Sequence, residues 1–281
     1  MKNPFSVPDD GLTSPEIGPW AEEKYRLIAL YAQLFSKGMK DKWDLRVYVD
    51  LYSGAGFGRV KGTDTRMMGS PLIALNVDHP FDRYIFCEQD PELLDALRER
   101  VKRIAPSTDV VYVNGSCDDH VEEILRAIPV GSVSTKVLSL CIVDPFDFGL
   151  KFETLRRLSR VYIDFLVLLA AQMDANRNYE HYVSKGNPKI DEALGMSDWR
   201  ARWEKSMMPR SAFPKFLAEE FSGSMTKIGY LPRKAHDMKL VKTYDNNMAL
   251  YYLGLFSKHP TAYKFWKDVM KYGTDQQSFW D

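Results

Sequence analysis

The sequence predicts an α/β fold built on a mostly parallel sheet of seven strands, with one helix in front of it. Strand-like apolar runs alternate with amphipathic helical patterns, which is typical of βαβ units. The first run ends in an acid, and a loop with glycines at alternate positions follows at 50–58. Two further strand-like segments, 238–244 and 248–256, are joined by Asp-Asn-Asn, which predicts an antiparallel hairpin at the sheet edge.

The elements follow from periodicity and capping residues. Residues 19–40 read as a helix, because apolar positions such as Leu27, Tyr31 and Leu34 recur at three- and four-residue steps. Expected helix starts are Ser70 with Pro71, Asp90, and a capping box of Asp119 with Glu122. The first predicted strand ends at Asp50, and the next four cover 83–88, 109–113, 136–143 and 161–169. The later helices are expected at 70–78, 90–101, 119–128, 152–159, 211–221 and 260–272.

Repeats, low-complexity tracts and linkers are absent from the sequence, so a single domain over 1–281 is expected. Its parts are an N-terminal helical segment, a core, a helical insertion and a C-terminal hairpin with helix, at 1–45, 46–169, 170–223 and 224–281. The first ten residues lack the apolar stretch of a signal peptide, and the run at 165–173 is too short to span a bilayer. The sequence therefore predicts a cytoplasmic protein without a membrane partner.

The composition limits the function classes. Of the 281 residues 45% are hydrophobic and 27% charged, and the formal net charge is zero. Non-specific binding to nucleic acid, which needs a basic surface, is disfavoured, although a local basic groove remains open. Three cysteines, Cys87, Cys117 and Cys141, lack metal-ligand spacing. They are expected to be buried thiols in a reducing cytoplasm.

Five parallel strands closed by an antiparallel hairpin are similar to the Rossmann-like fold of class I S-adenosylmethionine-dependent methyltransferases. A hydride-transfer dinucleotide fold normally ends on a parallel strand, so an NAD-linked oxidoreductase matches less well. In such sheets the cofactor lies at the carboxyl ends of the strands. The glycine loop is therefore expected to hold the methionine part of S-adenosylmethionine through Asp50, Ser53, Gly54 and Gly56. The alternatives are a tight turn that binds nothing and, for Asp50, a carboxylate that caps the turn.

Two further strand ends supply polar groups. Glu88 ends the second strand, and its two oxygens suit the two adjacent hydroxyls of a ribose. A solvated strand end is the alternative. Asp118 follows the third strand, where it can accept a hydrogen bond from an adenine amino group or cap the next helix.

The fourth strand ends in Asp144, Pro145 and Phe146, which resemble the Asp/Asn-Pro-Pro-aromatic motif of amino-group methyltransferases of nucleic acids. That resemblance implies that the acid holds the target amine and that an aromatic ring stacks on the base. The chain departs from the motif, because Phe146 replaces the second proline and Asp147 occupies the aromatic position, with Phe148 one step later. A strand-end Asp-Pro turn without a catalytic role is the alternative.

Two segments near these strand ends could contact a ligand. Arg59, Lys61 and Arg66 make residues 58–69 basic, so this segment either closes over the cofactor, clamps a phosphate or is a solvated loop. Asn176 and Arg177 are predicted to bind the substrate. The insertion that follows carries aromatic residues that either stack on a base or pack between helices, namely Tyr182, Trp199 and Trp203, with His181 beside them.

Over nearly its whole length the chain resembles the three-Cys-motif partner family, TcmP. The likeness lies in modest motifs in a specific order: Gly18-Pro19-Trp20 with Lys24, 50–56, Gly69-Ser70-Pro71, Asp144-Pro145-Phe146, Asp164, Asn176-Arg177 and the closing segment 251–260. The resemblance implies a methyltransferase-like Rossmann domain and a neighbouring protein with a three-cysteine motif as partner. Asp147 stands where the family more often has Gly, and Ser116 stands where Asp usually follows the Gly.

Two functions follow as hypotheses. The first is a methyltransferase that uses S-adenosylmethionine on a nucleic-acid base or a protein partner, with Asp144 orienting or deprotonating the nucleophile and Pro145 and Phe146 shaping the pocket. The second is a non-catalytic protein that keeps the cofactor pocket and works by binding the three-Cys-motif protein.

Overall fold

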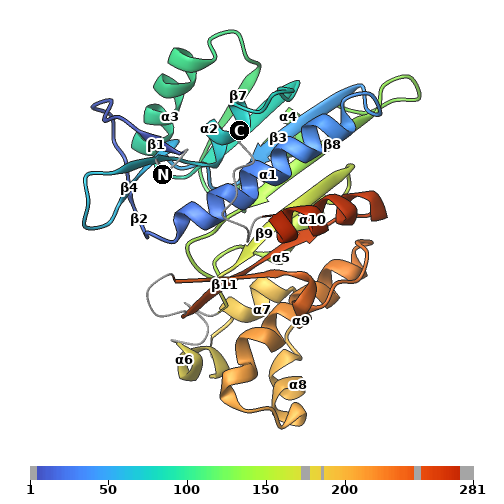
Figure 1. Ribbon diagram of the computed structural model, residues 1–281. Helices are drawn as coiled ribbons and strands as arrows, with labels where there is room; N and C mark the ends of the chain where they lie inside the picture. Colours follow the sequence, from blue (N-terminus) through green and yellow to red (C-terminus); the bar gives the residue numbers. More distant parts are fainter. Residues whose placement is uncertain (1–4, 172–177, 185–186, 244–247, 273–281) are drawn as a thin grey trace. The chain divides into compact units, whose positions relative to one another are not determined.

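A computed structural model describes residues 5–171, 178–184, 187–243 and 248–272. The chain divides into two compact units, one formed by residues 1–142 and 260–281 and the other by residues 143–259 (Figure 1). The organisation as one domain of four parts stays a prediction.

The strands and helices alternate as expected. The strands are β1 (Ser6–Val7), β2 (Glu16–Ile17), β3 (Leu45–Asp50), β4 (Phe57–Val60), β5 (Arg66–Met68), β6 (Arg83–Glu88), β7 (Val110–Asn114), β8 (Val137–Val143), β9 (Ile163–Leu169), β10 (Lys239–Lys242) and β11 (Ala249–Phe256). The α-helices are α1 (Ala21–Met39), α2 (Ser70–Leu75), α3 (Pro91–Ile104), α4 (Val121–Ala127), α5 (Phe152–Leu158), α6 (Tyr179–Val183), α7 (Lys189–Leu194), α8 (Trp199–Ser206), α9 (Phe213–Lys227) and α10 (Pro260–Tyr272). Within the described ranges, 3₁₀ turns lie at η2 (Arg210–Ala212) and η3 (Ala235–Asp237).

The large sheet has seven strands in the order β10-β11-β9-β8-β3-β6-β7. Strand β3 pairs in parallel with β6 and β8, and β6 pairs in parallel with β7. Strand β11 pairs antiparallel with both β9 and β10. The predicted fold class is therefore confirmed: the sheet is mostly parallel and carries a C-terminal antiparallel hairpin.

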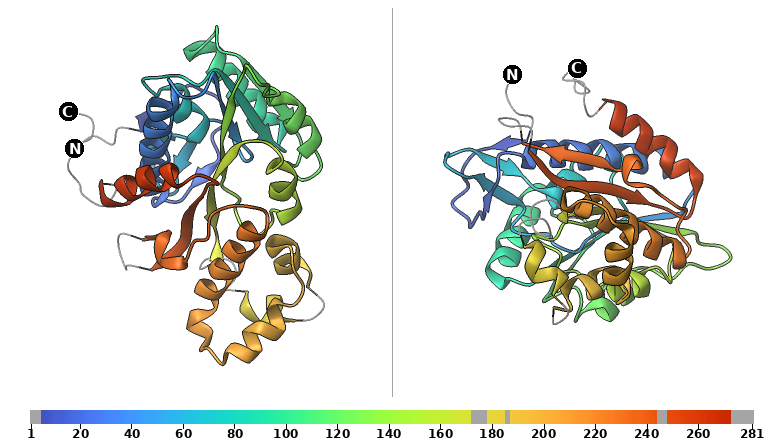
Figure 2. Two further views of the ribbon diagram at one scale, coloured as in Figure 1. Left: turned by 90° about the vertical axis from the view of Figure 1, so that its right-hand side faces the viewer. Right: turned by 90° about the horizontal axis from the view of Figure 1, so that it is seen from below.

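In the first unit the buried core lies between the parallel strands and the helices packed on them. Residues 47–49 of β3 are fully buried, as a strand covered on both faces requires. Helices α3 and α4 pack against β6 and β7, whereas α1 packs against α2 and α10. Figures 1 and 2 show α1 and α10 side by side, and the rings of Tyr31 and Trp266 meet edge to face at 6.0 Å.

The first unit also contains a small sheet that the sequence did not predict, with the order β1-β5-β4-β2. The segment expected to be a basic loop is the antiparallel hairpin β4–β5. Strand β1 pairs with β5, and β2 pairs with β4. Strands of two to four residues are too short to show a period in the sequence, which explains the omission.

The second unit joins the antiparallel strands β9, β11 and β10 to a helical segment in which α7 packs against α5 and α9, and α8 against α9. Its aromatic residues form a core around Phe213, whose ring lies 4.9 Å from Tyr179 and 5.0 Å from Trp203. Tyr182, Trp199 and Trp203 are buried. The interpretation of these residues as helix packing is confirmed, and that of a base-stacking surface is wrong.

Of the three N-terminal helix caps predicted from the sequence, one is observed. The Asp90 side chain accepts hydrogen bonds from the backbone N–H groups of Glu92 and Leu93, as a cap should. Helix α2 instead starts after Gly69, and α4 starts after His120, without a side-chain cap at either. The capping box predicted for Asp119 and Glu122 is therefore wrong, and the N-cap of α4 is not Asp118.

Candidate functional site

The glycine loop follows β3 directly, and two of its glycines have different tasks. Gly54 has φ +56°, and a Cβ added there would meet no described atom within 4 Å. Gly56 has φ +81°, and a Cβ added there would lie 2.8 Å from Leu97 Cδ1 of α3. Both angles favour glycine. Gly56 therefore allows the loop to pack on α3, while Gly54 leaves backbone exposed to open space that a ligand can approach.

The residues around Gly54 fix the loop on the neighbouring strand. The backbone N–H and the hydroxyl of Ser53 both donate to the carbonyl oxygen of Cys87, at 3.0 and 3.2 Å. Asp50 is fully buried and accepts from the backbone N–H of Tyr52 at 3.2 Å. Asp50 thus has the turn-capping role that was its alternative. Its contact with a cofactor stays a prediction.

Glu88 lies next to the glycine loop at the end of β6. Its Oε2 accepts the backbone N–H of Gly54 at 2.9 Å, and its Oε1 accepts the backbone N–H of Asp90 at 3.0 Å. The side chain is half-buried. A carboxylate offers about four lone-pair positions, so two bonds to amides leave acceptor capacity on both oxygens. The structure therefore places Glu88, the predicted ribose ligand, beside Gly54, which was predicted to lie against the methionine part.

The end of β7 closes the same edge of the first unit. The backbone N–H of Gly115 donates to the carbonyl oxygen of Glu88 at 3.0 Å. Asp118 is half-buried, and its backbone N–H donates to Ser116 Oγ at 3.2 Å. Ser116 thus shapes the turn that carries Asp118.

A half-buried tyrosine that the sequence analysis did not single out, Tyr52, links these strand ends. The pKa of Tyr52 is raised, mainly by burial and to a lesser extent by the nearby thiol of Cys117, which is its hydrogen-bond partner. Burial likewise raises the pKa of Cys117, to about 12, although the hydrogen bond with Tyr52 acts in the opposite direction. Tyr52 is the second residue after the end of β3, and that position beside the glycine loop was the signal available in the sequence. It joins the glycine loop to the turn after β7.

The cysteines are structural. All three are free and buried, and burial raises the pKa of the Cys87 and Cys141 thiols. Protonated, enclosed thiols are poor nucleophiles and poor metal ligands. Among the described residues, no group of three or more His, Cys, Asp and Glu could hold a metal ion.

Two basic side chains of the β4–β5 hairpin form ion pairs with acids of the N-terminal segment. Arg59 pairs with Glu16 at 2.8 Å, and Arg66 pairs with Asp9 at 2.6 Å. Both acids belong to the segment that carries β1 and β2, so the hairpin is fastened to the N-terminus of the chain. The segment is thus a hairpin held by strand pairing and two ion pairs rather than a solvated loop, and its contact with a cofactor or a phosphate stays a prediction.

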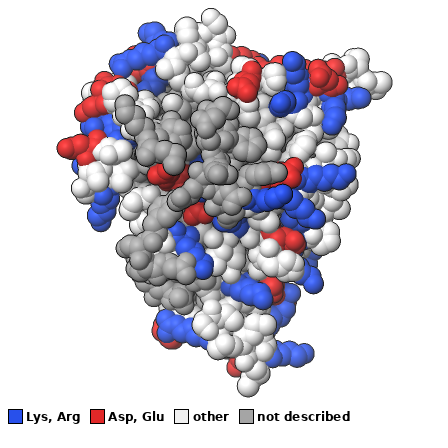
Figure 3. Space-filling view, viewed as in Figure 1, with Lys and Arg blue, Asp and Glu red and all other residues white. Residues whose placement is uncertain are grey.

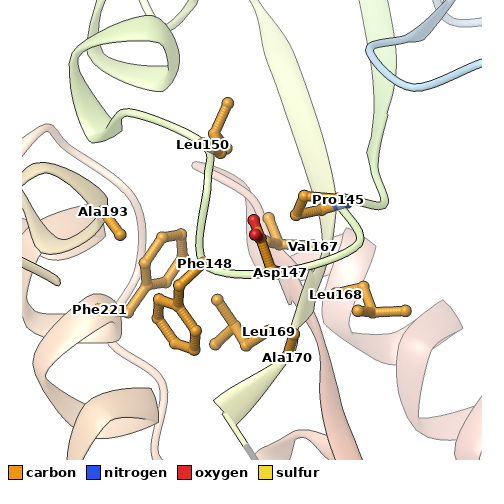
Figure 4. A pocket seen from close by; sticks show the side chains of 10 residues that line it. All are labelled: Pro145, Asp147, Phe148, Leu150, Val167, Leu168, Leu169, Ala170, Ala193 and Phe221. Atoms are coloured by element: carbon orange, nitrogen blue, oxygen red, sulfur yellow. The ribbon is translucent and has the colours of Figure 1, made fainter. Parts of the chain in front are cut away.

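In the second unit, the residues that follow β8 differ in their exposure to solvent. Pro145 is buried, Asp144 is half-buried, and Phe146 is 90% exposed. Asp147 pairs with Lys189 at 2.6 Å, while Phe148 is buried. Figure 4 shows Phe148 and Phe221 among the side chains that line a mostly apolar cavity of about 20 Å³. That volume is about what one water molecule needs and is too small for a cofactor or a base. Phe146, rather than Phe148, offers an accessible ring.

The predicted substrate residues Asn176 and Arg177 lie outside the described residues. Of the residues after them, His181 is exposed beside the buried Tyr182. No helix in the described part of the chain is long and apolar enough to cross a membrane.

Comparison with known proteins gives fold likeness only. No family model matches the sequence, and neither does any curated protein. The complex of Trm1 from Pyrococcus horikoshii with S-adenosyl-L-methionine is similar with a TM-score of 0.46 and 9% identity, over 92% of this chain and 61% of that one. P. horikoshii TYW2 in complex with MeSAdo is similar with a TM-score of 0.43 and 12% identity, over 90% and 71%. Protein LPL1258 from Legionella pneumophila has a TM-score of 0.40 and 16% identity, over 63% and 74%.

The chain has the class I methyltransferase fold. This follows from its own strand order, with parallel strands followed by an antiparallel hairpin, rather than from likenesses at these scores. The chain spans less than two thirds of the Trm1 structure.

Proposed function

We propose that this chain binds S-adenosylmethionine and transfers its methyl group to an amine of a nucleic-acid base. The observation that carries the proposal is the pairing of the Gly54 N–H with Glu88 Oε2 at 2.9 Å, beside open space over Gly54. It supports a site in which the loop backbone lies against the methionine part while Glu88 accepts hydrogen bonds from the ribose hydroxyls. Asp118 then accepts from the adenine amino group.

When bound, the cofactor supplies an electrophilic methyl group on a positively charged sulfur. Asp144 orients the amine through a hydrogen bond and accepts the proton that the nitrogen loses as its bond to carbon forms. Pro145, which is buried, fixes the backbone that carries Asp144. Phe146, which is 90% exposed, stacks on the base. Asn176 and Arg177 bind the substrate.

The charge of the second unit supports a nucleic acid as substrate better than the zero net charge of the whole chain does. Residues 143–259 contain more Lys and Arg than Asp and Glu, and the rest of the chain has the opposite excess. The second unit, which carries Asp144 and Phe146, is therefore the more basic one. Figure 3 shows acidic and basic side chains intermixed over the face in view, without a continuous field of one sign. Recognition of a particular amine fits this pattern better than non-specific binding does.

Two measurements test the proposal. Mass spectrometry of ligand released from the purified protein should detect S-adenosylmethionine or its demethylated product. Incubation with methyl-labelled cofactor and cellular RNA or DNA should give labelled nucleic acid with the wild type and none with Asp144→Ala. Equal labelling by both proteins would refute the role of Asp144, and the absence of ligand and of labelling would refute the function.

One observation favours a second candidate. The aromatic position of the amino-methyltransferase motif holds Asp147, which is engaged in an ion pair with Lys189 at 2.6 Å. A chain of the TcmP type that keeps the cofactor pocket but has lost transfer would bind its three-Cys-motif partner instead. Co-purification of the two proteins that persists in Asp144→Ala, together with no labelling of nucleic acid, would favour this candidate.

A further inference from the structure

Arg100 is a buried arginine in α3, and every nitrogen of its guanidinium group is engaged. Its side chain is 2% exposed. Nε and Nη2 donate to the two carboxylate oxygens of Asp10, at 2.8 and 2.7 Å. Nη1 donates to the carbonyl oxygen of Ala55 at 2.6 Å and to that of Thr13 at 2.9 Å. The group also lies over the ring of Phe57, with its central carbon 4.3 Å from the ring centroid.

These contacts join two parts of the chain that are distant in sequence. Asp10 and Thr13 belong to residues 5–17, the N-terminal strap, which also contains β1 and β2. Further hydrogen bonds from Nη2 reach the carbonyl oxygen of Leu12 and the hydroxyl of Ser14, both at 3.1 Å. Ala55, on the other side of the guanidinium, is the residue between the two glycines of the cofactor loop. A single planar cation thus ties the strap to the loop.

The glycine loop is held at three successive residues. Gly54 donates to Glu88, the carbonyl of Ala55 accepts from Arg100, and Gly56 packs on Leu97. Only the first contact comes from a predicted cofactor residue. The other two come from α3, and the middle one depends on Asp10, because an arginine this deeply buried needs a charged partner.

We propose that Arg100 and Asp10 form a clasp by which the N-terminal strap fixes the glycine loop in the conformation that accepts S-adenosylmethionine. Arg100 is a positioning residue, since it contacts the loop backbone and reaches the cofactor only through it. The proposal rests on the proposed function for the identity of the ligand. It assigns the strap a role in ligand binding, in addition to its place in the small sheet.

The test makes two measurements on each full-length protein: the mobility of the loop without ligand, and the affinity for ligand. Amide hydrogen exchange of residues 54–56 reports on the loop alone, and calorimetry with S-adenosylhomocysteine reports on binding. The variants are Arg100→Lys, which cannot make the bidentate pair, and Asp10→Asn, which keeps the shape and removes the charge. Arg59→Gln is the matched control, because it breaks an ion pair to Glu16 of the same strap at a side chain that is 39% exposed.

The clasp predicts that both variants exchange the loop amides about tenfold faster and bind S-adenosylhomocysteine about tenfold more weakly, while the control stays within about twofold of the wild type. If Arg100→Lys does not fold, Asp10→Asn alone decides. Wild-type exchange in the loop of these variants would overturn the clasp, even if their melting temperature falls. A wild type that binds no S-adenosylhomocysteine would refute the proposed function, while the exchange data would still decide on the clasp.

Discussion

Replacing Glu88 by alanine tests the proposed cofactor site at its best-defined point. The carboxylate accepts one backbone N–H on each oxygen, from Gly54 at 2.9 Å and from Asp90 at 3.0 Å. One lone-pair position on each oxygen then remains for the two ribose hydroxyls. Alanine removes the acceptors for the ribose and leaves the Gly54 N–H without its partner, so both ligand contact and loop order are lost.

The magnitude follows from the exposure of this edge. Hydrogen bonds to a charged group contribute roughly 1.5–3 kcal/mol each, but Glu88 is half-exposed and water competes for it. A net loss of about 2 kcal/mol corresponds to about thirtyfold weaker binding. Glu88→Gln keeps one acceptor oxygen, so it should lose about half of this free energy, or about fivefold in affinity.

Isothermal calorimetry with S-adenosylhomocysteine measures these affinities directly. Glu99→Ala is the matched control, because Glu99 is an exposed carboxylate in α3. The expected order of affinity is wild type and Glu99→Ala, then Glu88→Gln, then Glu88→Ala. If Glu88→Ala binds as tightly as the control, Glu88 does not hold the ribose and the site assignment is wrong.

Three further changes have distinct expected outcomes. Burial raises the pKa of Asp164 from 3.8 to about 7, against smaller opposing effects of its Ser257 hydrogen bond and of Lys258. The folded state therefore binds this proton more tightly than the unfolded state does. The free energy of unfolding falls as the pH rises from about 4 to about 7, by at most about 4 kcal/mol. Urea unfolding of Asp164→Asn should lack this pH-dependent loss, and the same pH dependence in wild type and variant would contradict the assignment. Gly56→Ala should unfold at lower urea concentration than Gly54→Ala, because its Cβ would lie 2.8 Å from Leu97 Cδ1. Gly54→Ala should weaken S-adenosylhomocysteine binding, and its positive φ alone should lower the free energy of unfolding by about 1–2 kcal/mol. Phe146→Ala should leave the melting temperature unchanged and reduce labelling of nucleic acid about tenfold, since base stacking contributes about 1–3 kcal/mol; undiminished labelling would exclude stacking.

Periodicity predicted most of the large sheet, because its central strands are long and apolar. Strands β8 and β9 have seven residues each, all buried, and such runs are unmistakable in sequence. The small sheet escaped prediction because its strands depend on pairing with partners elsewhere in the chain. Arg59 and Arg66 read as a solvated basic loop until their partners Glu16 and Asp9 are placed beside them.

The candidate site was predictable only where residue type and strand position together suffice. Glu88 could be chosen as an acid at a strand end, but its bond to Gly54 depends on how β3 and β6 pair. Arg100 was missed although the sequence holds a signal: it is a charged residue three positions after Leu97, beside the apolar stripe of its helix. Trp199 and Trp203 were ambiguous, since the i, i+4 spacing describes a buried face and a binding face equally.

The most direct test of the cofactor site is a titration of isotope-labelled protein with S-adenosylmethionine, followed through the backbone amide signals of Gly54 and Gly115. Both amides are hydrogen-bonded to Glu88, one to its side chain and one to its carbonyl oxygen. If S-adenosylmethionine binds at this edge, both signals shift saturably with one common dissociation constant. Signals that do not move at saturating ligand, or that move only in proportion to its concentration, would contradict it.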